Sequence, residues 1–173
     1  VAMYAHAANG GIKIDKTAHT GVEGLYACGE ATGGMHGADR IGGLSSANGI
    51  VFGRIAGASA ALTAQKEPEA ALKADITLPQ YGIATTDAER LTHSLRHTMS
   101  TYCMINRTET GLSEALQQLE SLQDKAMALS KPHADDSEIA ALARLQSQIR
   151  LAQEMVKAMR KRTESLGSHY RAD

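Results

Sequence analysis

The sequence predicts an α+β protein in which an incomplete α/β segment is followed by an antiparallel three-helix bundle. The first observation is the distribution of glycine, since 13 of the 16 glycines stand at or before Gly57. The second is helical, leucine-rich periodicity in the later residues. The third is an aromatic content of 3% with no Trp, which leaves aliphatic side chains to build the core. We divide the chain into a glycine-rich segment at 1–64, a linker at 65–85 and a helical domain at 86–173.

The glycine-rich segment predicts two strands and a loop. Residues 11–15 (GIKID) form the first short strand. Residues 24–29 (GLYACG) form the second, and we expect it to be buried on both faces, as in a parallel sheet. A glycine-rich loop then covers residues 30–43.

A helix follows the loop. Ser45 and Ser46 are good N-cap residues for a helix over residues 47–63. Along it, glycines recur every four residues at 49, 53 and 57. Because glycine weakens a helix by about 1 kcal/mol relative to Ala, the repeated glycines predict close approach to another element and a buried helix.

Three amphipathic helices are predicted in the rest of the chain. The linker contains one short helix around Ala70. Thr86 and Glu89 have the spacing of a capping box, which begins the first helix of the domain. The three helices are marked by apolar residues at helical spacing: Leu91, Leu95, Met99 and Tyr102; Leu112, Leu116, Leu119 and Leu122; and Ile139, Leu142, Leu145, Ile149, Ala152, Met155 and Met159.

Charge and composition exclude several classes of function. The net charge is -1, so no basic field attracts nucleic acid. No apolar run approaches the ~18 residues of a membrane span, and we expect no direct membrane insertion. Cys28 and Cys103 match neither a disulfide framework nor a zinc site, which favours the reducing cytoplasm. The spacing of His6, His19 and His36 predicts no metal site.

Groups suited to anions gather in the glycine-rich segment. His6 and Arg40 each stand beside glycines, which leave backbone N–H groups free to face a carboxylate. The alternative is that Arg40 pairs with Asp39 or Glu30. A helix start at Ser45 offers unpaired N–H groups to an electron-rich group, and a carboxylate after a buried strand can accept hydrogen bonds from sugar hydroxyls. No glycine motif for a pyrophosphate is present.

Together these residues resemble a known family. Residues 24–57 (GLYACGEATGGMHGADRIGGLSSANGIVFGRIAG) look like the C-terminal flavin-binding segment of the flavoprotein subunits of succinate dehydrogenase and fumarate reductase. Residues 6–12 (HAANGGI) are similar to that family's upstream histidine motif. Residues 95–99 (LRHTM), 107–115 (RTETGLSEA) and 162–173 (RTESLGSHYRAD) resemble its helical domain and its C-terminus.

The resemblance implies a cofactor and a substrate. FAD would be bound in the full-length protein, and the resemblance assigns it Glu30 for the ribityl chain, Ser45 and Ser46 for the pyrimidine edge, and Gly29 and Gly43 in the flanking turns. His6 and Arg40 would bind the carboxylates of succinate or fumarate. A hydride would pass to or from flavin N5. No catalytic residue is expected in this chain, because the family's proton-donating arginine belongs to another domain.

The resemblance covers the last third of such a flavoprotein, so we expect a fragment that is inactive alone. It implies a cytoplasmic location, peripheral to the membrane through partner subunits, and it implies an iron-sulfur partner subunit. Two alternatives stay open. One is a fragment of an L-aspartate oxidase-like flavoprotein, and the other is a non-catalytic helical interaction module. Unpaired strand edges in the glycine-rich segment predict self-association.

Overall fold

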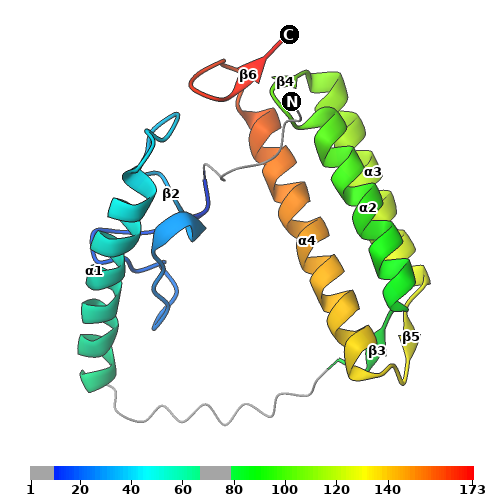
Figure 1. The fold of residues 1–173 in the computed structure, drawn as a ribbon, viewed down its shortest axis with the longest axis horizontal. Helices are drawn as coiled ribbons and strands as arrows, with labels where there is room; N and C mark the ends of the chain where they lie inside the picture. Colours follow the sequence, from blue (N-terminus) through cyan, green and yellow to red (C-terminus); the bar gives the residue numbers. More distant parts are fainter. Residues whose placement is uncertain (1–9, 67–78) are drawn as a thin grey trace. The chain divides into compact units, whose positions relative to one another are not determined.

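A computed structural model describes residues 10–66 and 79–173, which belong to two compact units, Val1–Ala74 and Asp75–Asp173 (Figure 1). The described residues form helices α1 (Leu44–Lys66), α2 (Thr85–Tyr102), α3 (Glu109–Ala128) and α4 (Asp136–Lys161), and the short 3-10 helix η1 (Gly29–Ala31). Their strands are β1 (Ile12–Lys13), β2 (Thr32–Gly33), β3 (Tyr81–Gly82), β4 (Asn106–Arg107), β5 (Lys131–Pro132) and β6 (Tyr170–Arg171). The mixture of helices and strands agrees with the predicted class.

The first unit contains one parallel strand pair. Strand β1 lies within the predicted strand at 11–15 and pairs with β2, with Ile12 opposite Thr32. The two backbones meet closely, because a Cβ added to Gly11 would lie 2.4 Å from the carbonyl oxygen of Ala31. Only glycine fits there, and its φ of 141° also disfavours other residues.

The predicted buried strand at 24–29 is wrong. Only Tyr26 forms a bridge, with His19, and Leu25 is 50% exposed. A parallel strand is buried by neighbours on both sides, and the described residues of this unit supply none beyond that bridge. Tyr26 is held instead by its hydroxyl, which lies 2.7 Å from Thr63 Oγ1 on α1, and by edge-to-face packing against the His19 ring.

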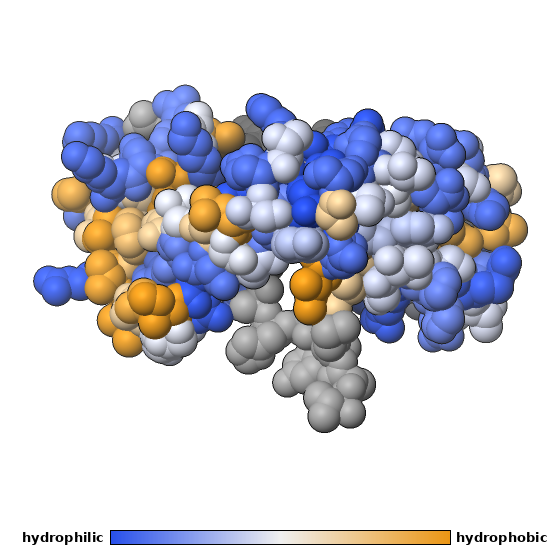
Figure 2. Space-filling model, turned by 90° about the horizontal axis from the view of Figure 1, so that it is seen from above, coloured by the Kyte–Doolittle hydropathy of each residue, from blue (hydrophilic) through white to orange (hydrophobic). Residues whose placement is uncertain are grey.

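Helix α1 differs from its prediction at both its start and its surface. It begins at Leu44, so Ser45 and Ser46 lie in its first turn and do not cap it. Its predicted burial is also wrong, since Ile50 is 74% exposed and Val51 is likewise exposed. Within the described part of the first unit, no element covers this face. Figure 2 shows hydrophobic residues gathered at the surface on the left, where α1 lies. The short helix predicted around Ala70 lies outside the described residues.

The second unit has a continuous aliphatic core. Helices α2, α3 and α4 occupy the three predicted helical segments and pack against one another pairwise (Figure 1). Leucines at helical spacing line the shared interior, as amphipathic helices require. The core comprises Ile83, Ala88, Leu91, Leu95, Cys103, Leu112, Ala115, Leu119, Leu122, Ala126, Leu142, Leu145, Ile149, Ala152 and Val156.

Short strand pairs join the connections between these helices. Strand β3, before α2, pairs antiparallel with β5, between α3 and α4. Strand β4, between α2 and α3, pairs parallel with β6, after α4. Ile83, which is fully buried, anchors the first pair, because its backbone N–H donates to the Glu138 carbonyl oxygen at 3.1 Å.

The helix caps lie where the sequence did not predict them. Helix α2 begins at Thr85 without a side-chain cap, so the capping box predicted for Thr86 is wrong. Thr108 caps α3 by accepting a hydrogen bond from the Gly111 N–H at 3.1 Å. The capping box stands at α4, between Asp135 and Glu138. Hydrogen bonds from the Ser137 hydroxyl and the Glu138 N–H hold the pKa of Asp135 below its usual value.

Residues 162–173, here called the C-terminal arm, return to the helix ends. Arg171, with a side chain 5% exposed, donates to the carbonyl oxygens of Met159, Arg160 and Arg162 at the end of α4. His169 accepts from Arg107 Nη1 at its Nδ1 and lies 3.2 Å from the Arg162 carbonyl oxygen through Nε2. Burial, together with the nearby arginines, lowers the pKa of His169.

Candidate functional site

One hollow in the first unit gathers most of the polar side chains that the sequence singled out. It lies where η1 and β2 meet the first turns of α1, and the loop between β2 and α1 closes its rim. It is lined by Gly10, Glu30, Thr32, Gly33, Gly34, His36, Gly37, Arg40, Ser45 and Asn48. We call this set the α1 hollow.

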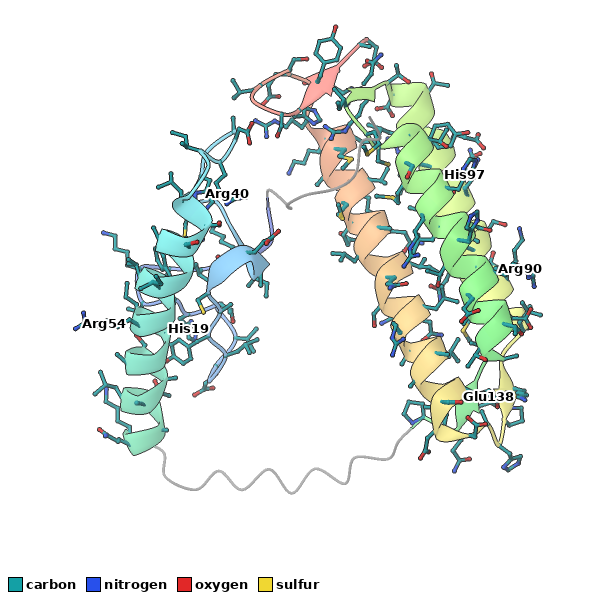
Figure 3. All side chains as sticks on the ribbon, viewed as in Figure 1. His19, Arg40, Arg54, Arg90, His97 and Glu138 are labelled. Atoms are coloured by element: carbon teal, nitrogen blue, oxygen red, sulfur yellow. The ribbon has the colours of Figure 1, made fainter. Side chains whose placement is uncertain are left out.

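Three predicted site residues line the α1 hollow: Glu30, Arg40 and Ser45. Figure 3 shows Arg40 beside the first turn of α1. Ser46 is exposed in the same turn. His6 lies outside the described residues.

The two predicted glycines shape the approach to the hollow without lining it. Gly29 begins η1 with a φ of 74°, and Gly43 directly precedes α1 with a φ of 87°. Both values lie in the left-handed region that glycine adopts without strain. Each residue therefore permits a turn that delivers the next element to the hollow.

Three further side chains, Thr32, His36 and Asn48, were not predicted as site residues. Thr32 is buried, and its hydroxyl donates to the Gly29 carbonyl oxygen at 2.7 Å. Asn48 is 8% exposed, and its Nδ2 lies 3.3 Å from His36 Nε2. Its Oδ1 is buried without a hydrogen-bond partner. The sequence held one signal, since Asn48 is a polar residue three positions after Ser45, on the same side of the helix.

The hollow is built to receive an anionic or electron-rich group. The first turn of α1 has N–H groups without helical partners and carries the positive end of the helix dipole. Arg40 adds a full positive charge at the same end. Its own backbone N–H donates to Asp39 Oδ1 at 2.8 Å, so the contact between these neighbours involves the arginine backbone.

Glycines leave room in the hollow for a ligand. A Cβ added to Gly34 or Gly37 would meet no atom within 4 Å, and both residues have positive φ. Open space beside a bare backbone lets a ligand approach peptide groups closely. The chain therefore offers backbone N–H groups, one guanidinium, one imidazole and a buried amide in one place.

The remaining histidine and the cysteines lie apart from this chemistry. His19 packs on Tyr26, and its Nδ1 accepts from the Gly21 N–H at 3.0 Å. Cys28 is exposed and Cys103 is buried, which raises the pKa of the Cys103 thiol to about 11. Across residues 10–66 and 79–173, no three His, Cys, Asp or Glu side chains gather as metal ligands.

The residues of the hollow fit part of a flavin. A helix start facing an electron-rich ring edge, a carboxylate facing sugar hydroxyls and an unpartnered buried amide oxygen match the hydrogen-bonding groups of such a ligand. The observation that carries the fit is the Asn48 Oδ1, which lacks a partner beside a site rich in donors and acceptors.

Comparison with protein families matches two consecutive parts of the chain. Residues 1–46 match the model described as FAD binding domain, and residues 92–173 match the model described as fumarate reductase flavoprotein C-term. The two matches fall in the two structural units.

Curated relatives match along the whole chain. A subunit of the fumarate reductase (CoM/CoB) of Methanothermobacter marburgensis is 32% identical and is matched over 100% of this chain and 33% of the relative. L-aspartate oxidase 2 of Ralstonia nicotianae is also 32% identical, over 100% of this chain and 30% of the relative. The chain thus spans about a third of the length of the curated relatives that it matches.

Solved structures give the same result. Escherichia coli quinol fumarate reductase FrdA matches with a TM-score of 0.79 at 27% identity, over 94% of this chain and 30% of that one. Mycobacterium smegmatis Sdh1 in complex with UQ1 matches with a TM-score of 0.78 at 28% identity, over 94% of this chain and 29% of that one.

Fold, hollow and matches together define a segment of an FAD-binding flavoprotein. The chain belongs to the succinate dehydrogenase and fumarate reductase flavoprotein family, which also includes L-aspartate oxidase. The family resemblance predicted from the sequence, with FAD as cofactor, is therefore confirmed. Among the helices of the described residues, none has the length and apolar character needed to cross a membrane.

Proposed function

We propose that this chain is part of a flavoprotein that interconverts succinate and fumarate. The observation that carries the proposal is the α1 hollow, where Arg40, Ser45 and Glu30 meet at the start of α1. A dicarboxylate needs a fixed cation, and a guanidinium binds a carboxylate through two parallel N–H groups. Bound FAD supplies the hydride acceptor or donor at N5, and the other roles fall to protein side chains.

The proposed roles follow the chemistry of each residue. Arg40 and His6 bind and orient the substrate carboxylates, so that the reacting carbons lie against the flavin ring. Glu30 accepts hydrogen bonds from ribityl hydroxyls. Ser45 and Ser46, with the first N–H groups of α1, face the pyrimidine edge, while Gly29 and Gly43 allow the turns on either side. The proton-donating arginine belongs to a part of the flavoprotein outside this chain.

We further propose that the second unit is an antiparallel three-helix bundle that supports an iron-sulfur partner subunit. The strand pairs β3–β5 and β4–β6 favour this arrangement, because each joins connections at opposite ends of consecutive helices. The proposed division is a flavin-binding segment at 1–64, a linker at 65–85 and a helical domain at 86–173. Its place is cytoplasmic, peripheral to the membrane through partner subunits.

A titration of the purified chain with FAD tests the proposal. We expect quenched flavin fluorescence on binding and a further change in the flavin spectrum on adding succinate or fumarate. Arg40→Gln should weaken the dicarboxylate effect about 10- to 100-fold, since a hydrogen bond to a charged group is worth ~1.5–3 kcal/mol. Arg54→Gln is the matched control, because Arg54 lies exposed on α1 (Figure 3). Equal losses in both variants, or no FAD binding, would contradict the proposal.

An L-aspartate oxidase-like activity is the second candidate, and the match to L-aspartate oxidase 2 favours it. The same titration separates the two. A spectral change with L-aspartate in place of succinate indicates that an α-ammonium group is recognised, whereas a change with succinate and fumarate alone favours the first proposal.

A non-catalytic helical module is the third candidate. It is favoured by the contrast between the buried core of the second unit and the exposed Ile50 and Val51 of α1. Specific FAD binding that depends on the hollow would contradict it.

A further inference from the structure

We propose that Asn48 positions His36, and that these two side chains together bind a hydroxyl or N–H group of the flavin in the α1 hollow. The inference rests on the proposed function, because it takes FAD as the occupant. Asn48 comes from the second turn of α1 and His36 from the loop that follows β2. Both line the hollow beside Arg40.

The geometry gives His36 one tautomer. Asn48 Nδ2 lies 3.3 Å from His36 Nε2, and an amide nitrogen can only donate. Nε2 therefore accepts, and the ring proton of a neutral His36 stands on Nδ1. Asn48 is buried, so packing within the unit holds the amide that makes this bond.

The other end of the same amide lacks a partner. Asn48 Oδ1 is buried and makes no hydrogen bond. Native proteins rarely leave such an atom unpartnered, because water would have supplied the bond before folding. The hollow lies beside it, so a ligand there that carries a donor can supply the missing bond after a small rotation of the amide.

The chemistry of that donor distinguishes the flavin from the substrate. A dicarboxylate dianion presents only acceptor oxygens, and so it cannot satisfy a second acceptor. A flavin presents a ring N–H and ribityl hydroxyls. Asn48 therefore acts on the flavin, whereas Arg40 acts on anionic groups.

Riboflavin is the probe for this assignment, because it has the ring and the hydroxyls but no phosphate. We expect the purified chain to quench riboflavin fluorescence and Asn48→Leu to bind about tenfold more weakly, which corresponds to one buried hydrogen bond. Asn106→Leu makes the same chemical change at an exposed site in the second unit and should bind as the wild type does. Circular dichroism verifies that each variant is folded.

The ¹⁵N spectrum of the His36 ring supplies a readout that a merely structural role would not move. The wild type should show the Nδ1–H tautomer, and Asn48→Leu should lose that preference. Asn48→Asp keeps the shape and an acceptor oxygen, so riboflavin binding should persist while the His36 proton moves to Nε2. This variant also serves if Asn48→Leu does not fold.

The outcomes separate the inference from the proposed function. Equal riboflavin binding by the wild type and Asn48→Leu, or an Nε2–H tautomer in the wild type, overturns the inference and leaves the proposed function standing. No binding of riboflavin or FAD by the wild type overturns both.

Discussion

The two long helices α1 and α4 show how differently the two units use similar sequence material. Helix α4 places Leu145, Ile149 and Val156 in a core shared with α2 and α3. Helix α1 has comparable apolar content, yet Ile50 and Val51 face outward and, of its residues, only Asn48 and Ala56 are buried. The second unit is therefore stabilised by aliphatic burial, whereas the first is held by turns, glycine contacts and a few polar bonds.

The contrast teaches that periodicity alone does not decide burial. Heptad-like leucines in α2, α3 and α4 meet one another within a short stretch of chain, so their partners are at hand. The apolar residues of α1 and the segment 24–29 require partners that the described residues of the first unit do not supply. Function follows the same division, since the polar hollow lies in the unit with the smaller core.

The largest expected effect comes from the core of the second unit. Leu119→Ala removes a fully buried side chain from α3 and should lower the free energy of unfolding by about 2–5 kcal/mol. Ile50→Ala on α1 should change it by less than about 0.5 kcal/mol, because that side chain is mostly exposed. Urea denaturation followed by circular dichroism measures both. Similar losses would mean that α1 is buried in solution and would end the contrast.

A helix cap gives the next effect. Thr108→Ala removes the cap of α3 and should cost about 1 kcal/mol. Thr86→Ala should cost much less, because α2 has no side-chain cap. The comparison of two Thr→Ala changes in one unit isolates capping from helix propensity. A larger loss at Thr86 would restore the capping box that the sequence predicted.

In the first unit, one polar bond should matter in place of a core. Tyr26→Phe removes the hydroxyl bound to Thr63 and should open the segment around Tyr26 by about 0.5–1.5 kcal/mol. Amide hydrogen exchange of residues 18–27 measures this opening. Tyr81→Phe, at an exposed site in β3, is the control and should leave exchange in its own unit unchanged.

The smallest effect concerns pH and the second unit alone. Burial lowers the pKa of His169 in the folded state, so the unfolded state binds the proton first. Stability should therefore fall as the pH drops below about 6.5, the usual pKa of histidine. His169→Phe should flatten this dependence, while His97→Gln, at an exposed site on α2, should retain it. Stability that rises on acidification would contradict the burial of a neutral His169.

The sequence allowed the three helices of the second unit to be predicted, because their partners lie nearby in the chain. It did not locate the caps, since Thr86 and Glu89 have the right spacing but the helix begins one residue earlier. In the hollow, charge and glycine pointed to Glu30, Arg40 and Ser45. Asn48 and His36 escaped, because their importance depends on a contact between side chains twelve residues apart.

The pairing of β4 with β6 carries a consequence for the order of folding. Contacts among α2, α3 and α4 join elements that follow one another, whereas β4 must wait until both α3 and α4 have formed and returned the chain. Closing that long loop costs entropy before it gains any bond. The C-terminal arm should therefore be the last part of the unit to fold and the first to open, so that its amides exchange through local opening while those of the helix cores exchange only on global unfolding.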